Sequence, residues 1–239
     1  MLGSRILKKS AALTAVSTTL ALEIEEKTKR TVTIISNGLD PLDIQLLPTD
    51  AIRNEAAKGP YILCVGRLEP LKGFSDAIRL LAELRKRGRS LRLLFAGSDN
   101  GAEGELRNLA IALALQDSIS FLGRVPREQL GWLYSSAAVV LVTSITESFS
   151  LVTLEAMSVG APCVASSVGG ILDIVSNGEN ALLYPYGDVQ SAVNHVESII
   201  TDPNLARKLS AGARDSISKF SWDRIAREYE SVYRTVLHA

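Results

Sequence analysis

Short apolar runs alternate with longer amphipathic segments along most of the chain. The apolar runs are nearly continuous, which is typical of strands covered by helices on both faces. They predict strands at 31–36, 61–66, 91–98, 118–123, 138–144, 161–167 and 181–185. The 3.6-residue period predicts helices at 74–88, 105–115, 127–137, 151–160 and 189–200. This alternation predicts an α/β fold: a single Rossmann-like doubly wound parallel sheet with flanking helices.

Two segments depart from this alternation. Residues 41–60 show no clear period and are expected to form an irregular connection. In the last segment, apolar residues return at steps of three and four, which predicts a helix with a broad apolar face. That face holds Trp222, Ile225, Ala226, Tyr229, Val232, Tyr233 and Val236. Periodicity does not identify the partner of such a face, so packing on its own domain and docking elsewhere both remain open.

Composition limits the classes of function. The chain has 239 residues, with 26 basic and 26 acidic side chains. This balance argues against a nucleic-acid partner, because phosphate neutralisation needs surplus Lys and Arg. Cys64 and Cys163 lie inside apolar runs, far from His195 and His238. They are typical of buried thiols in a reducing compartment, and we expect no metal site.

The amino terminus imitates a signal peptide, with a basic segment followed by an apolar one. However, four of the twelve residues at 11–22 are Ser or Thr, and a charged stretch follows at once. No run approaches the roughly 20 apolar residues of a membrane helix. We therefore expect a cytoplasmic location.

The loops that follow the strands carry the candidate chemistry, because ligands of parallel sheets bind beyond the carboxyl ends of strands. The loop GRLEPLKG supplies Arg67 and Lys72, a cation pair able to neutralise a diphosphate. The stretch ESFSLVTLE places Glu147 and Glu155 on either side of a helix start. A carboxylate is suited to accept hydrogen bonds from vicinal sugar hydroxyls. The amides of residues 149–151 would attract an anion.

Each of these residues, taken alone, is more often a solvated charge or a partner of a helix dipole. Their occurrence at successive loops of one sheet edge favours a ligand with both hydroxyls and phosphates, such as a sugar nucleotide. Other nucleotide folds lack their motifs here. The loop after the strand at 61–66 has no G-x-G-x-x-G, and the chain has neither a P-loop nor a G-x-S-x-G elbow.

Ordered motifs from about residue 10 onward resemble the carboxyl-terminal half of family-four glycosyltransferases of the GT-B fold. They are AVS (15–17), ISNGLDP (35–41), YILCVGRLEPLKG (61–73), LLFAGSDNG (93–101), the segment at 118–137, TESFSLVTLEAMSVGAPCVASSVGGILDIVSNGENALLYPYGD (146–188) and FSWDRIAREYESVY (220–233). The resemblance implies a retaining enzyme that transfers a hexose from a nucleoside diphosphate sugar of the UDP or GDP type. It implies no obligatory metal and no other cofactor.

The resemblance also implies roles for individual residues. Arg67 and Lys72 match the pair that binds the donor diphosphate, and Glu147 matches a glutamate beside the donor sugar; these three are the expected catalytic residues. Glu155 matches a ribose ligand. The other expected substrate-binding residues are Gly66, Arg124, Phe149, Ser150, Leu151, Gly169 and Gly170. Ser150 departs from the usual Gly, and Leu172 and Asp173 replace the usual Pro and Glu, which leaves the donor sugar open.

The resemblance predicts three parts: a remnant of an amino-terminal domain and crossover at 1–36, a nucleotide-sugar-binding domain at 37–220 and a final helix at 221–239. Two functions compete. The chain is the donor half of a transferase that needs an acceptor domain, or it is a non-catalytic nucleotide-sugar-binding or interaction module. A related epimerase fits the paired glutamates less well. Expected partners are the donor and either a separate acceptor-binding chain or a second copy, with an acceptor at a membrane surface as one possibility.

Overall fold

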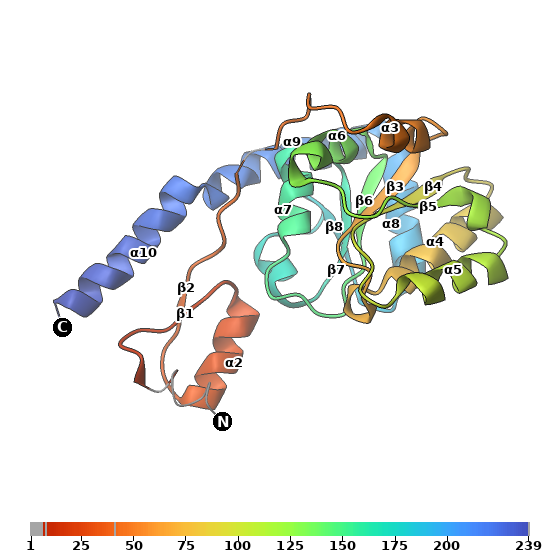
Figure 1. Ribbon diagram of the computed structural model, residues 1–239. Coiled ribbons are helices and arrows are strands. Elements are labelled where there is room, and N and C mark those ends of the chain that lie inside the picture. The colour runs from red at the N-terminus through yellow and green to blue at the C-terminus, as the bar shows by residue number, and fades with distance from the viewer. Residues whose placement is uncertain (1–6, 8, 41, 239) are drawn as a thin grey trace.

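A six-stranded parallel sheet forms the centre of the molecule, in the order β5-β4-β3-β6-β7-β8 (Figure 1). The computed structural model describes residue 7, residues 9–40 and residues 42–238, so most of the basic segment at 1–10 lies outside the described residues. The strands are β3 (Tyr61–Val65), β4 (Arg92–Ala96), β5 (Ile119–Phe121), β6 (Val139–Val142), β7 (Cys163–Ser166) and β8 (Leu182–Tyr184). Each strand lies within an expected run, and the predicted α/β fold is confirmed.

The order of the strands reverses between β3 and β6. From β3 the chain adds β4 and then β5 on one side, and it returns to add β6, β7 and β8 on the other. Ile62 pairs with Val139 and Leu63 with Val140, so β3 and β6 end side by side. A ligand crevice forms at such a switch point, because the loops that leave the two strands turn to opposite faces of the sheet.

Helices cover both faces of the sheet. Side chains of α4 (Phe74–Lys86), α5 (Glu103–Ala112) and α8 (Val189–Thr201) share one core cluster with Ile62 and Cys64. Side chains of α6 (Arg127–Ser136) and α7 (Leu151–Ser158) share the other cluster with Tyr61 and Leu63. Alternate residues of β3 therefore enter opposite cores, which explains the continuous apolar runs.

The expectation of an irregular connection at 41–60 is wrong in part, because helix α3 (Asp50–Ala56) lies there. Its Ile52 and Ala56 are buried, a single apolar step of four that is too short to show a period. A further helix, α9 (Pro203–Ser216), begins after Asp202, whose side chain accepts hydrogen bonds from the amides of Asn204 and Leu205. The short 3₁₀ turns are η1 (Pro70–Lys72), η2 (Gln116–Ser118), η3 (Gly169–Asp173) and η4 (Ile217–Phe220).

A small amino-terminal unit lies beside the main sheet (Figure 1). In it, β1 (Thr14–Ala15) pairs in parallel with β2 (Thr33–Ile34), and α2 (Thr18–Thr28) connects them. This unit contacts the main body through Asp173 at the end of η3. The carboxylate of Asp173 accepts hydrogen bonds from the amide of Thr18 at 2.8 Å and from its hydroxyl at 2.6 Å.

The final amphipathic segment forms helix α10 (Trp222–Leu237), as expected. The helix leaves the main body and runs beyond it on the side of the amino-terminal unit (Figure 1). Ile225 is buried, whereas Trp222 is 48% and Tyr233 is 64% exposed. Among the described residues no helix has the length and apolar character to cross a membrane. The division at 36 and 220 stays a proposal.

The loops after β3 and β4 approach each other so closely that they leave no room for a side chain at Gly97. A Cβ atom there would lie 1.8 Å from the carbonyl oxygen of Gly66. We expect Gly97→Ala to lower the free energy of unfolding by at least about 1–3 kcal/mol, since backbone atoms must move. Urea unfolding measures the loss.

Gly104→Ala is the matched control for this substitution. Gly104 lies in α5 with no heavy atom within 4 Å of a Cβ atom, so the change should raise stability by up to about 1 kcal/mol. Unchanged stability of Gly97→Ala would contradict the close approach of the two loops.

Candidate functional site

The loop after β3 carries Lys72 to the carboxyl edge of the sheet. Lys72 ends η1, and Gly73 follows in the left-handed region at φ 62°. A Cβ atom on Gly73 would lie 2.2 Å from the carbonyl oxygen of Thr143, just after β6. The hydroxyl of Thr143 donates a hydrogen bond of 2.7 Å to the carbonyl of Lys72. The backbones that follow β3 and β6 are thus in direct contact at the switch point.

An ion pair joins these two loops. Lys72 Nζ lies 2.7 Å from Glu147 Oε2, and the hydroxyl of Ser144 donates to the same oxygen at 3.3 Å. The side chains of Lys72 and Glu147 are 22% and 17% exposed, so water and salt screen the pair less than a surface pair. An anionic ligand that approaches Lys72 therefore has to compete with the carboxylate of Glu147 for the lysine ammonium.

The loop after β7 holds the backbone of Glu147. The amide of Gly170 donates a hydrogen bond of 2.8 Å to the carbonyl of Glu147. A Cβ atom on Gly169 would lie 1.9 Å from the same carbonyl oxygen, and one on Gly170 would lie 2.3 Å from that of Ser148. The glycine pair is therefore required by backbone contact. Three loops, after β3, β6 and β7, converge on Glu147.

Helix α7 begins at this point, with Ser150 as its N-cap. Ser150 has φ 82° and ψ 77°, a conformation that favours glycine. Its hydroxyl oxygen accepts from the amide of Thr153 at 3.4 Å, which partly offsets the strain. Within the described part of the chain, the amides of Leu151 and Val152 have no hydrogen-bond acceptor. Ser150 and Val152 line a small cavity together with Lys72 and Glu147.

Phe149 and Leu151, the residues on either side of Ser150, differ in the exposure of their side chains. The side chain of Phe149 is 3% exposed and packs edge to face against Phe220, with ring centroids 6.1 Å apart. Only the backbone of Phe149 is therefore suited to contact a ligand. The side chain of Leu151 is exposed at the start of α7.

Glu155 lies one turn further along α7 and is nearly buried. Its Oε2 accepts a hydrogen bond of 3.0 Å from the hydroxyl of Tyr134, and its Oε1 accepts one of 3.1 Å from Arg127 Nε. Arg127 Nη2 also donates to the carbonyl of Asp40 at 2.8 Å. Burial and the nearby carboxylate of Glu155 raise the pKa of Tyr134 well above its usual value, so this hydroxyl stays protonated.

The structure places two of the expected cations away from this cluster. Arg67 is 65% exposed and forms an ion pair with Glu69 at 3.0 Å. Arg124 is exposed and forms no ion pair with any described residue. The structure brings together Lys72, Glu147, Ser150 and the glycines at 169–170. Gly66 lies close to Lys72, because a Cβ atom on this glycine would lie 3.7 Å from the lysine Cε. Both arginine side chains are exposed.

Several residues that contact the expected site were not predicted. They are Thr143, Ser144, Arg127 and Tyr134. Thr143 and Ser144 end an apolar run with two hydroxyls, a signal that can be read from the sequence. The contacts of Arg127 and Tyr134 with Glu155 depend on how α6 packs against α7, and no local pattern reports that packing.

Comparison with known proteins identifies the family. A model of "Glycosyl transferases group 1" matches residues 49–216. The chain belongs to the group 1 glycosyltransferases. It is 34% identical over 215 residues to an uncharacterized glycosyltransferase of Methanocaldococcus jannaschii, which covers 86% of this chain and 54% of that protein. It is also 31% identical over 232 residues to a D-inositol 3-phosphate glycosyltransferase of Corynebacterium aurimucosum. That match covers 92% of this chain and 55% of the relative.

Solved structures give the same picture of the fold. Sucrose-phosphate synthase from Thermosynechococcus elongatus superposes with a TM-score of 0.85 at 29% identity, over 100% of this chain and 61% of that one. The structure of Anabaena HepE in complex with UDP-glucose superposes with a TM-score of 0.86 at 23% identity. The match covers 98% of this chain and 66% of that one. The resemblance to GT-B glycosyltransferases is therefore confirmed. The chain spans about half the length of the curated relatives it matches.

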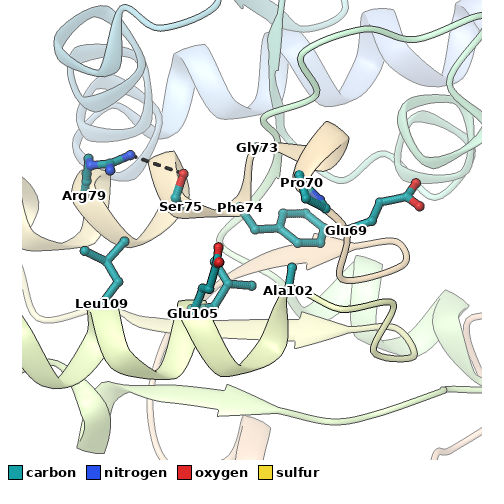
Figure 2. A pocket seen from close by; sticks show the side chains of 10 residues that line it. Glu69, Pro70, Gly73, Phe74, Ser75, Arg79, Ala102, Glu105 and Leu109 are labelled. Carbon is teal, nitrogen blue, oxygen red and sulfur yellow. Dashed lines mark hydrogen bonds between the residues drawn. The ribbon is translucent and has the colours of Figure 1, made fainter.

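This group 1 glycosyltransferase also has a larger hollow of about 360 Å³ between α4, α5 and η1 (Figure 2). Glu69, Phe74, Arg79 and Glu105 line it, and Arg79 donates a hydrogen bond of 3.2 Å to Ser75. Phe74 lines both this hollow and the small cavity beside Lys72. Among the described residues no three His, Cys, Asp or Glu side chains gather as ligands for a metal ion.

The partly buried pair of Lys72 and Glu147 should be coupled in stability. We expect Lys72→Met and Glu147→Gln each to lower the free energy of unfolding by about 1–3 kcal/mol, since each leaves a polar group without its partner. The double variant should lose less than the sum, by about 0.5–3 kcal/mol. A double-mutant cycle in urea measures the coupling.

The exposed pair of Lys86 and Glu83 is the matched control, with an expected coupling below about 1 kcal/mol. Additive losses at Lys72 and Glu147 would show that the two charges do not interact in solution.

Proposed function

We propose that this chain is the donor-binding half of a retaining glycosyltransferase that takes a hexose from a nucleoside diphosphate sugar. The observation that carries the proposal is the ion pair of Lys72 and Glu147 at the switch point. Beside it lie the free amides at the start of α7 and two glycines packed against the Glu147 loop. Cation, carboxylate and open amides at one edge suit a ligand with phosphates and sugar hydroxyls.

In this proposal, the diphosphate binds to Lys72 and to the amides of Leu151 and Val152. Arg67 leaves Glu69 and completes the contact with its planar guanidinium. Transfer breaks the bond between the anomeric carbon and the donor phosphate oxygen, and the diphosphate takes the electron pair. Fixed positive groups that meet this developing charge lower the barrier. The acceptor hydroxyl oxygen forms the new bond on the same face of the sugar, and its proton passes to the departing diphosphate oxygen.

Glu147 accepts hydrogen bonds from the donor sugar once Lys72 has turned to the phosphates. Glu155 accepts hydrogen bonds from the ribose hydroxyls. Gly66, Gly169 and Gly170 let the backbone approach the donor, and Arg124 borders the base. We infer a UDP or GDP donor and a reaction in the cytoplasm. We also infer that the reaction needs no metal, because Lys72, Arg67 and the helix amides supply the positive charge. One relative is named for D-inositol 3-phosphate and another for sucrose phosphate, so we assign only the donor class.

The apolar face of α10 suggests that further polypeptide completes the working enzyme. Trp222 and Tyr233 expose large rings on an amphipathic helix, and exposed apolar patches mark interaction surfaces. We propose that an acceptor-binding domain or another chain covers this face. Positioning of an acceptor against the donor is worth about 7–11 kcal/mol of the barrier, so the 239 residues alone should bind donor but transfer sugar poorly.

The Lys72→Ala substitution tests the proposed diphosphate contact. Calorimetry should compare UDP and GDP with uridine and guanosine. Loss of a charge-assisted bond costs about 1.5–3 kcal/mol, so affinity for the preferred nucleoside diphosphate should fall about 10- to 150-fold. Affinity for the nucleoside should change little, because the nucleoside carries no phosphate.

Lys86→Ala serves as the control, since Lys86 forms an ion pair with Glu83 on the solvent-facing side of α4. If the unmodified chain binds no nucleoside diphosphate, the proposed function is wrong. If Lys72→Ala weakens both classes of ligand equally, Lys72 acts through the fold and not through the phosphates.

A further inference from the structure

We propose that Arg127 is a positioning residue for the donor. Its guanidinium fixes the Glu155 carboxylate for the two ribose hydroxyls and anchors it to the carbonyl of Asp40. This inference rests on the proposed function, in which Glu155 faces the ribose. Arg127 itself is not assigned a contact with the donor.

Arg127 bridges two parts of the chain that are far apart in sequence. It begins α6, and its Nε donates to Glu155 Oε1 at 3.1 Å while its Nη2 donates to the carbonyl of Asp40 at 2.8 Å. The arginine side chain is 45% exposed, whereas that of Glu155 is 10% exposed. A planar guanidinium can hold both acceptors in one geometry, and a lysine ammonium lacks this fixed fork.

The second oxygen of Glu155 is held in the same way. The buried hydroxyl of Tyr134 donates to Oε2 at 3.0 Å. Each carboxylate oxygen has two lone pairs, so each keeps one acceptor site after the bonds to Arg127 and Tyr134 are made. Two remaining sites on adjacent oxygens match two vicinal hydroxyls. Without Arg127 one oxygen loses its partner, and the bond from Tyr134 alone orients the carboxylate.

The linker that leads into Asp40 packs against the carboxyl-terminal part of the chain. The amide of Leu39 donates to the carbonyl of Phe220 at 2.8 Å. A Cβ atom on Gly38 would lie 2.3 Å from the ring of Trp222, so the backbone there lies directly on the indole. Arg127 therefore links the orientation of Glu155 to the linker between the amino-terminal unit and the sheet.

The test compares ligands with and without the ribose hydroxyls. Calorimetry on the full chain compares the affinity for UDP with that for 2′,3′-dideoxy-UDP, and the affinity for GDP with that for 2′,3′-dideoxy-GDP. The unmodified chain should prefer the hydroxylated ligand about 10-fold or more, as expected for hydrogen bonds to a charged group. Arg127→Gln should reduce this preference to less than about threefold, by the loss of one oriented acceptor.

A purely structural role would lower affinity for both ligands equally and leave their ratio unchanged. Arg127→Lys keeps the positive charge and is the second variant if Arg127→Gln does not fold. It should also show a reduced ratio, because an ammonium lacks the planar fork. Arg224→Gln is the matched control: Arg224 is an exposed arginine paired with Glu228 on α10, and its loss should leave the ratio as in the unmodified chain.

The outcomes separate the two proposals. If neither UDP nor GDP binds the unmodified chain, the proposed function fails. If one of them binds but the chain shows no preference for the hydroxyls, or if both Arg127 variants keep the full preference, the role of Arg127 is overturned while diphosphate binding stands. A reduced ratio in the Arg127 variants and an unchanged one in Arg224→Gln is the expected result.

Discussion

The ion pair between Lys72 and Glu147 joins the two strands at which the sheet reverses its order. β3 and β6 end side by side, and their loops turn to opposite faces, toward α4 and α7. The pair spans this divergence at 2.7 Å. The packing around it is set by backbone contacts: Gly73 against Thr143, and the glycines at 169–170 against the Glu147 loop. These backbone contacts therefore fix the positions of Lys72 and Glu147 at the carboxyl edge of the sheet.

The pair also explains how the site keeps its charges matched without a ligand. Leaving a partly buried lysine or glutamate without a partner costs several times more than an exposed pair contributes. Lys72 is paired with Glu147 in the structure. In the proposed mechanism, Lys72 would exchange this partner for a donor phosphate, and Glu147 would accept hydrogen bonds from sugar hydroxyls. Arg127 and Tyr134 likewise give each oxygen of the Glu155 carboxylate a hydrogen-bond donor.

The sheet could be predicted because each of its strands is apolar on both faces, a pattern that survives in the sequence without any tertiary information. Helix α3 could not, because one buried turn at Ile52 and Ala56 is too short to show a period. Lys72 and Glu147 could be selected because each follows an apolar strand. That Glu147 pairs with Lys72 while Arg67 pairs with Glu69 could not be predicted, since loop backbones decide it.

Ser150 shows how sequence and structure complement each other. The resemblance to the family marks Ser150 as a replacement of the usual glycine. The structure shows why glycine suits this position, since the φ of 82° is one that residues with a side chain rarely adopt. Its N-cap hydrogen bond to Thr153 compensates in part. The contacts of Arg127, in contrast, join α6, α7 and the linker, three segments that only the folded chain brings together.

A crystal structure of the chain with a nucleoside diphosphate sugar tests the central claim most directly. We expect the diphosphate at the carboxyl edge, with a phosphate oxygen within hydrogen-bond distance of Lys72 Nζ and of the amides that open α7. We also expect the sugar beside Glu147 and the ribose beside Glu155. Ligand bound instead in the hollow between α4 and α5 (Figure 2), with the pair of Lys72 and Glu147 unbroken, would contradict the account.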